Sequence, residues 1–298
     1  MSELSTADIE HFIEHGFVLL RDCIEPQVRR EWVARSWVRN GYDPADRSTW
    51  TQNRIHMPGH EYRPMSVVAP RLERASEELL GGAERIRDLQ QAHDGFIVNF
   101  GVDLERDWAP SSAAAGGWHK DGDWFVHFLD GPEQGLLVIM LWDDVEHLGG
   151  PTYIACDSIG VVTRFLAQHP EGIHPAEEPG FDFQELIGQC GDFREATGKA
   201  GDCYLLHPFM LHTGSRNKLG AARFITNNNV RLREPMRFDR ADPRDHSPVE
   251  RAVLRGLDVD TYPFRITGER RPVVPERERI QAELRAAELK RLGLPQPS

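Results

Sequence analysis

Residues 118–156 read WHKDGDWFVHFLDGPEQGLLVIMLWDDVEHLGGPTYIAC. Three short runs in this stretch, 118–128, 135–145 and 150–156, are rich in β-branched and aromatic residues and are separated by glycine, proline and aspartate. Runs of this kind predict β-strands. Further runs follow the same pattern at 95–101, 201–209 and 222–232. Many short strands without strand–helix alternation indicate a sandwich or barrel and argue against a doubly wound α/β sheet.

Helical patterns precede the strands. Residues 5–15 predict an amphipathic helix with Ser5 and Asp8 as a capping box and Gly16 as its end, followed by a short buried strand, FVLL. A second helix is expected to begin at Pro26, and a third to run from Pro70 to the glycines after Leu80.

In two long segments the apolar residues recur at neither helical nor strand spacing. Residues 40–69 are rich in turn formers and aromatics and predict a long loop of the kind that forms lids. Residues 160–200 are expected to interrupt the strand series with a helix and a Pro/Gly-rich loop. The tail from residue 275 predicts a highly charged helix that is either docked on the surface or frayed.

The composition excludes several classes of function. The chain of 298 residues carries 47 acidic and 35 basic residues, a formal charge of −12, which opposes broad attraction to nucleic acid or anionic membranes. Small molecules or proteins are the expected partners, and a homodimer is possible. Four scattered cysteines without a CxxC pair predict reduced, mostly buried thiols. With no signal-like or membrane-length apolar stretch, a cytoplasmic location is expected.

The tripeptide His119-Lys120-Asp121 is a candidate metal-binding pair. On a strand, alternate side chains share a face, so the imidazole and the carboxylate are expected to project together while Lys120 points away as a surface or rim charge. Two imidazoles and one carboxylate form the facial triad of non-heme Fe(II) oxygenases. Taken alone, an HxD match is more often a hydrogen-bonded surface pair.

The third ligand is expected in a later segment, AGDCYLLHPFMLHTGSRNKLGAARF (200–224), which contains His207 and His212. Their odd separation predicts opposite faces of a strand, so only one reaches the metal. His207, which precedes a proline, is predicted to be a packed histidine with a backbone hydrogen bond. Elsewhere, His127 is predicted to be a pocket or core residue, and His147 an exposed one.

These motifs together resemble the phytanoyl-CoA dioxygenase-like family of Fe(II)/2-oxoglutarate oxygenases. The family pattern is an HxD on one strand, a distal histidine in an H-x-x-x-x-N turn, and an arginine about eleven residues after that histidine. His212, Asn217 and Arg223 match it. The resemblance runs from the opening helix to about residue 235 and implies a mainly β fold, a double-stranded β-helix (jelly-roll) core with flanking helices.

The resemblance implies a cofactor set and the residues that hold it. Iron is expected on His119, Asp121 and His212, with 2-oxoglutarate chelating it through the C1 carboxylate and the ketone. Arg223 is expected to hold the far carboxylate with two parallel hydrogen bonds, as a guanidinium does well.

Two further cosubstrate contacts are expected. A hydroxyl from Ser215 or Thr213 assists Arg223, the choice between them being open, and Asn99 supplies a polar contact. The chain is expected to form a single dioxygenase domain over 1–298, comprising N-terminal helices and the lid loop (1–94), the jelly-roll core (95–235) and a C-terminal helical extension (236–298).

The expected reaction is hydroxylation of an unactivated C–H in a small metabolite or natural-product intermediate, with consumption of O2 and release of succinate and CO2. Desaturation, epoxidation and ring formation use the same triad and stay open. Alternatives are a cupin-like metal protein or isomerase without 2-oxoglutarate chemistry, and a non-catalytic binding module; the cupin reading does not explain Arg223. Substrate selection is expected from the 160–200 insertion and from the 40–69 loop, in particular from Trp50, Arg54, His56, Met57, His60 and Tyr62.

Overall fold

The computed structural model describes residues 2–89, 91–174 and 182–295. An antiparallel sheet forms one wall of the molecule, in the order β1-β10-β7-β12-β6-β2, with β4 also paired to β12. Its strands are β1 (Phe17–Leu20), β2 (Arg54–His56), β4 (Ile86–Leu89), β6 (Ile97–Asn99), β7 (Leu136–Leu141), β10 (Cys203–Leu206) and β12 (Arg223–Leu232).

A smaller antiparallel sheet, in the order β11-β8-β9, faces the first. It is built from β8 (Thr152–Ala155), β9 (Phe193–Ala196) and β11 (Leu211–Gly214). The two sheets enclose one apolar cluster, to which β7, β8, β10 and β12 all contribute side chains. This is the jelly-roll core, a double-stranded β-helix, that the strand pattern and the family resemblance predicted. A separate two-stranded ribbon pairs β3 (Tyr62–Arg63) with β5 (Ala92–His93).

Strand β7 explains why the larger sheet is buried on both faces. Leu137, Ile139 and Leu141 belong to the cluster between the sheets, whereas Val138 and Met140 belong to the cluster on the opposite face. Period-2 alternation therefore sends every side chain of this continuous apolar run into one core or the other.

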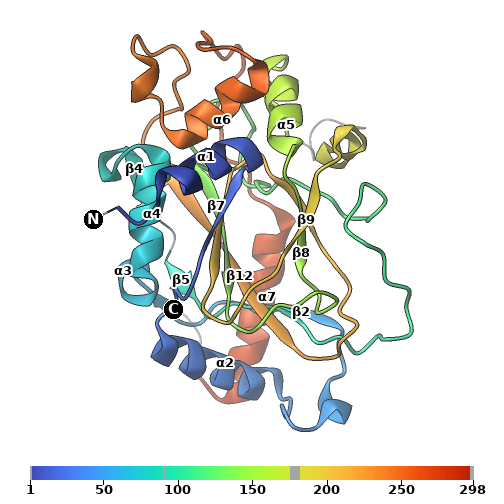
Figure 1. The fold of residues 1–298 in the computed structure, drawn as a ribbon. Helices are drawn as coiled ribbons and strands as arrows, with labels where there is room; N and C mark the ends of the chain where they lie inside the picture. The colour runs from blue at the N-terminus through green and yellow to red at the C-terminus, as the bar shows by residue number, and fades with distance from the viewer. Residues whose placement is uncertain (1, 90, 175–181, 296–298) are drawn as a thin grey trace.

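Helices cover the outer face and one end of the sheets. In Figure 1, α3 and α4 stand on one side of the larger sheet and β8 and β9 on the other, while α1, α5 and α6 lie together at one end. The helices are α1 (Thr6–His15), α2 (Pro26–Asn40), α3 (Met65–Val68), α4 (Pro70–Leu80), α5 (Ser158–Ala167), α6 (Pro248–Leu257) and α7 (Glu276–Leu292). No helix in the described ranges has the length and apolar character needed to cross a bilayer.

The predicted helix ends are confirmed. The Ser5 hydroxyl accepts a hydrogen bond from the backbone N–H of Asp8, and the Asp8 carboxylate accepts one from the backbone N–H of Ser5. Gly16 ends α1 in the left-handed conformation at φ 74°. Pro26 and Pro70 occupy the first turn of α2 and α4. The cysteines are free, and three of the four are buried.

The expected strand at 118–128 is wrong. This stretch makes only isolated bridges, His119 to His212, Phe125 to Pro272 and His127 to Ile173. Gly122 has a φ of 125°, and a Cβ there would approach the rings of Phe125 and His127 within 2.7 Å. The chain turns sharply at this glycine, so strand alternation does not extend past the HxD motif.

The two segments without a clean period are also more ordered than expected. Residues 40–69 contain β2, β3 and α3, and β2 extends the larger sheet by pairing with β6. The 160–200 insertion contains α5, as predicted, and also a 3-10 helix (Phe183–Gln189) and β9, which joins the smaller sheet. Most of the Pro/Gly-rich loop expected there, residues 175–181, lies outside the described residues.

Candidate metal centre

Two histidines from distant parts of the chain are held side by side by their own backbones. His119 and His212 exchange both backbone hydrogen bonds, each 3.0 Å from N to O, in an isolated antiparallel bridge. Residues paired in this way project their side chains on the same face. The ring centroids are consequently 4.3 Å apart.

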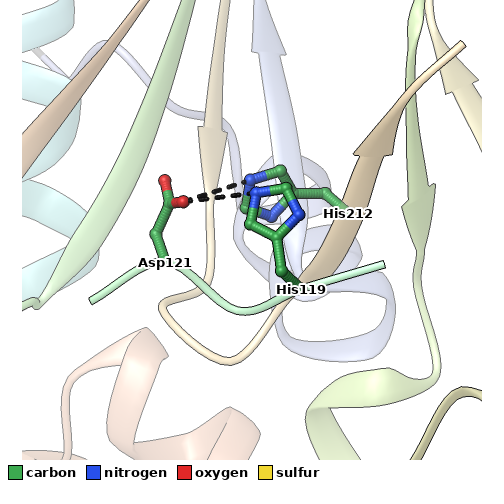
Figure 2. Close-up of side chains that lie close together, drawn as sticks. All are labelled: His119, Asp121 and His212. Atoms are coloured by element: carbon green, nitrogen blue, oxygen red, sulfur yellow. Dashed lines mark ion pairs between the residues drawn. The ribbon is translucent and has the colours of Figure 1, made fainter. Parts of the chain in front are cut away.

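Asp121 completes the cluster. Its Oδ1 lies 3.5 Å from Nε2 of His119 and 3.5 Å from Nε2 of His212, and one ligand atom from each of the three residues falls within 4.8 Å of the others. Figure 2 shows the carboxylate facing both imidazoles. The geometry brings together the three residues predicted to form a metal triad, although the HxD motif lies in a turn and not on a regular strand.

Hydrogen bonds fix which nitrogen of each imidazole faces the centre. Nδ1 of His119 lies 2.8 Å from the carbonyl of Gly117, and Nδ1 of His212 lies 3.1 Å from the carbonyl of Met210. A backbone carbonyl accepts only from a protonated nitrogen, so Nε2 of each ring is left as an unprotonated donor atom for a cation.

The cluster has the electrostatics of a cation site. Nε2 of His212 is buried without a hydrogen-bond partner. Burial opposes ionisation of Asp121, but the two imidazoles hold the pKa of its carboxyl well below the usual value. Two neutral imidazole nitrogens and one carboxylate oxygen on one side of a cavity suit a divalent transition metal with open coordination positions, and Fe(II) fits this donor set.

Arg223 begins β12, the strand whose Ile225 and Asn227 line the same cavity as the triad, and it has no counter-ion among the described residues. Only 1% of it is exposed, and none of its three guanidinium nitrogens has a hydrogen-bond partner among the described residues. Burial and the neighbouring Arg54 lower the pKa of its guanidinium to about 9. An unpaired buried cation is costly, so the site is built for an anion that the protein itself does not provide.

The other predicted cosubstrate contacts are engaged in backbone hydrogen bonds. The hydroxyl of Ser215 donates to the carbonyl of Pro151 at 2.6 Å, and that of Thr213 to the carbonyl of Gly116 at 2.9 Å. The Asn99 amide donates to the carbonyl of Ser215 at 3.2 Å, and Asn99 sits opposite Arg223 in the register of β6 and β12. Direct roles of Ser215, Thr213 and Asn99 toward a cosubstrate remain predictions.

Asn217, the last residue of the turn that follows His212, holds this turn in place. Its side-chain amide donates to the carbonyls of Asn99 and Ala221, and its Oδ1 accepts from the backbone N–H groups of Leu219 and Gly220. This network ties the turn after β11 to β6. It thereby fixes the position of Arg223 at the start of β12 relative to His212.

The triad faces a cavity of about 900 Å³. Residues that sequence reasoning missed form much of its wall: Gln134, Asn227, Asn228, Asn229, and Arg277 and Glu278 of α7. Of the six residues of the 40–69 segment expected to select substrate, Arg54 and His56 line the cavity. Trp50 and Met57 instead pack in the core, where their apolar surface is buried.

Lys120 corrects a second expectation. It was expected to point away from the metal as a surface or rim charge, but it lines the same cavity as Asp121 and is buried in its wall. Its ammonium lies 3.0 Å from the carbonyl of Asp121, 3.0 Å from Nδ1 of His127 and 3.3 Å from Oε1 of Gln134. Burial lowers the pKa of its ammonium to about 7. The expectation assumed that residues 119–121 belong to a regular strand, on which alternate side chains point to opposite faces. The turn at Gly122, which folds His127 back beside Lys120, means that this alternation does not apply.

Three further histidines lie as predicted. His127 is buried at the cavity wall, and His147 is exposed beside Glu195. His207 is fully buried, with its Nε2 3.3 Å from the carbonyl of Val249, and it takes no part in the triad.

The chain matches no family model and no curated protein. Among solved structures it is similar to the non-heme alpha-ketoglutarate-dependent carbocyclase SnoK from nogalamycin biosynthesis, with 14% identity over 78% of this chain and 86% of that chain and a TM-score of 0.48. HygX from Streptomyces hygroscopicus, solved with nickel, 2-oxoglutarate and hygromycin B, gives 12% identity, coverages of 76% and 87%, and a TM-score of 0.42. The non-heme monooxygenase ThoJ, in a nickel complex, gives 15% identity, coverages of 96% and 96%, and a TM-score of 0.39. All three likenesses are distant, so the chemistry of this site follows from its own side chains.

Proposed function

We propose that the protein is an Fe(II)- and 2-oxoglutarate-dependent dioxygenase that hydroxylates an unactivated C–H bond of a small molecule. One observation carries the proposal: His119, Asp121 and His212 line a cavity together with Ile225 and Asn227 of β12, and the same strand begins at Arg223, a buried guanidinium without an anionic partner among the described residues. A triad alone fits many metals, and a buried cation alone fits many anions. Their combination fits a chelating ketoacid with a second carboxylate.

The protein side chains bind and orient. His119, Asp121 and His212 would hold iron on one side and leave the cavity side to the cosubstrate and O2, while the Gly117 and Met210 carbonyls keep each imidazole in the required tautomer. When bound, iron and 2-oxoglutarate would supply the activation of O2, which is the oxidant and accepts four electrons: two from decarboxylation of 2-oxoglutarate to succinate and CO2 and two from the substrate C–H. Arg223 would pair with the far carboxylate of 2-oxoglutarate.

A metal-binding barrel without 2-oxoglutarate chemistry is a weaker reading. It gives the fully buried Arg223 no anion to pair with, and the cost of burying that charge would then stand without compensation. The proposal extends to the phytanoyl-CoA dioxygenase-like group, with the catalytic core at 95–235 and with Arg54 and His56 of the 40–69 segment contacting substrate.

The test is anaerobic spectroscopy of the whole protein. Addition of Fe(II) and 2-oxoglutarate is expected to produce a weak visible charge-transfer band, because the ketone and carboxylate chelate the metal. Succinate in place of 2-oxoglutarate is the control, since it lacks the keto group and should give no band. A wild-type protein that binds Fe(II) and shows no band with 2-oxoglutarate would contradict the proposal. If the band appears, a metabolite library scored by succinate release identifies the substrate.

A further inference from the structure

A second arginine lies in the same row as the proposed cosubstrate clamp. Arg54 of β2 is paired with Asn99 of β6, and Asn99 is paired on its other side with Arg223 of β12. Directly opposed residues of antiparallel strands project on one face of a sheet. The three side chains therefore emerge from adjacent strands on the same side.

Arg54 stands out among the basic residues that line the cavity because it has no partner. Arg277 is paired with Asp123 at 2.6 Å, and Arg231 with Asp88 at 2.9 Å. Within the described ranges, by contrast, no hydrogen bond or ion pair involves the Arg54 guanidinium, although it lines the cavity and is exposed there. Although part of the side chain is exposed, the residues packed around the guanidinium lower its pKa by partial desolvation, and no carboxylate opposes the shift.

The backbone makes room for this guanidinium beside the metal triad. Gly214 lies two residues after His212 in β11, and a Cβ on it would come within 2.9 Å of both Nη1 and Nη2 of Arg54. A side chain at position 214 would collide with Arg54. The guanidinium thus rests against the strand that carries a proposed iron ligand.

Among the charges close to Arg54, one positive charge is left over once the site is loaded, because the other carboxylates of the cavity wall, such as Asp182 and Glu278, are not near enough to raise the pKa of Arg54. Iron(II), Arg223 and Arg54 together contribute four positive charges, while Asp121 and doubly ionised 2-oxoglutarate contribute three negative ones. Arg54 also lies close enough to Arg223 to contribute to the lowered pKa of its guanidinium. A further anion beside Arg54 would relieve this excess.

The two arginines differ in how accessible they are from the cavity. Arg223 is 1% exposed, as suits a clamp reached only by the end of a slim cosubstrate, whereas Arg54 is exposed on the wall of the larger space. That space of about 900 Å³ lies within the range of about 300–1,000 Å³ usual for drug-sized ligands, well above what 2-oxoglutarate needs.

We propose that the primary substrate carries an oxyanion, a carboxylate or a phosphate, and that Arg54 binds it bidentately beside the metal. The shared chemistry is a planar guanidinium paired with two oxygens, which both anions provide. Arg54 then anchors the substrate at one end and presents a neighbouring C–H to the metal side of the cavity. This inference rests on the proposed 2-oxoglutarate-dependent function and names the substrate class for it.

The experiment uses probe anions on the loaded protein. Protein saturated with Ni(II) and 2-oxoglutarate is titrated calorimetrically with benzoate and, separately, with inorganic phosphate. At least one probe is expected to bind, and Arg54→Gln is expected to weaken that binding roughly tenfold or more. Which of the two probes binds more tightly distinguishes a carboxylate substrate from a phosphate. Arg231→Gln is the matched control, because Arg231 also lines the cavity but is already paired with Asp88; it should change probe affinity by less than about twofold.

Affinity for 2-oxoglutarate separates this inference from its rivals. Arg54→Gln should leave the 2-oxoglutarate Kd within about threefold of wild type, whereas Arg223→Gln should raise it strongly. An Arg54→Gln variant that loses 2-oxoglutarate as Arg223→Gln does would make Arg54 a second cosubstrate clamp and overturn the inference. So would probes that bind the folded variant and the wild type equally, or that bind neither. Failure of the proposed function itself looks different: the wild type would then not bind 2-oxoglutarate at all.

Discussion

His207 and His212 differ in what surrounds their rings. His207 is packed in the core with a backbone carbonyl as its partner, and His212 presents an unpartnered Nε2 to Asp121. His212→Ala should therefore abolish Fe(II) binding and succinate formation. His207→Ala should keep both and lose about 1–3 kcal/mol of stability, because a buried group loses its partner. Metal titration and chemical denaturation of both variants check this; an active His212→Ala beside a folded but inactive His207→Ala would reverse the assignment.

Arg223 permits a test that does not disturb the metal. Arg223→Ala should raise the apparent KM for 2-oxoglutarate strongly, in keeping with the loss of about 2–5 kcal/mol when one member of a buried charge pair is removed. Fe(II) affinity should be nearly unchanged, since Arg223 is not among the three clustered ligands. Equal 2-oxoglutarate affinity in the variant and the wild type would remove the clamp from the mechanism.

Residue spacing predicted the cluster because two short motifs each encode a local geometry. The i, i+2 pair His119 and Asp121 projects together even in a turn, and the Asn217 turn sets the distance from His212 to Arg223. Lys120 and Arg54 were harder to interpret. The surroundings of Lys120 depend on the turn at Gly122, and the partnerless state of Arg54 depends on three strands brought together from distant parts of the chain.

At the scale of elements, α7 shows how a polar helix can belong to a site. Its sequence indicated a docked or frayed surface helix, and only Leu289 of the helix is buried. Ion pairs hold it in place instead: Arg277 with Asp123 at one end and Glu288 with Arg39 at the other. Arg277 also lies over the Trp124 ring, 5.6 Å from its centroid. Such pairs leave no hydrophobic period in the sequence, so the docking could not be predicted from it.

Removal of one of these pairs should loosen the helix. Arg277→Ala is expected to speed amide hydrogen exchange in residues 276–284, because that end of α7 loses its attachment to Asp123 beside the metal motif. Arg279→Ala is the matched control, since the ion-pair partners of Arg279 in the described part of the chain are Glu276 and Glu283 of its own helix. If exchange in this segment rises equally in the two variants, the Asp123 pair does not anchor the helix.

Two strands, β2 and β9, could not be predicted from the sequence, and for the same physical reason. β2 and β9 are short, and every residue of β2 is exposed or only half-buried, so neither has the apolar alternation that marks a strand. They exist because an edge of an already formed sheet offers them backbone partners, β6 for one and β8 for the other. The continuous apolar runs at β7 and β10, by contrast, needed no such context and were predicted.

At the scale of the whole molecule, Glu250 of α6 contacts Arg85, which lies 165 residues earlier in the chain, and the nearby segment 237–240. Its fully buried carboxylate pairs with Arg85 and Arg240 and accepts backbone hydrogen bonds from Arg237 and Ser247. Burial opposes its ionisation, but the two arginines and these backbone groups lower its pKa to about 2. The helical layer at one end of the sheets is thus attached to the strand region through one ionised side chain.

This carboxylate should make stability depend on pH with a definite sign. The folded pKa of about 2 lies below the unfolded value of 4.5, so ionised Glu250 stabilises the fold fully above about pH 5, and this contribution is lost as pH falls toward 2. A depression of this size corresponds to about 3 kcal/mol. Glu250→Gln should therefore differ most from the wild type in urea unfolding at pH 7, and the difference should shrink progressively below pH 5. Glu234→Gln, at an exposed site, should track the wild type throughout. A stability difference between Glu250→Gln and the wild type that stays constant from pH 7 to pH 3 would mean that packing, and not the ionised carboxylate, accounts for the effect of the substitution.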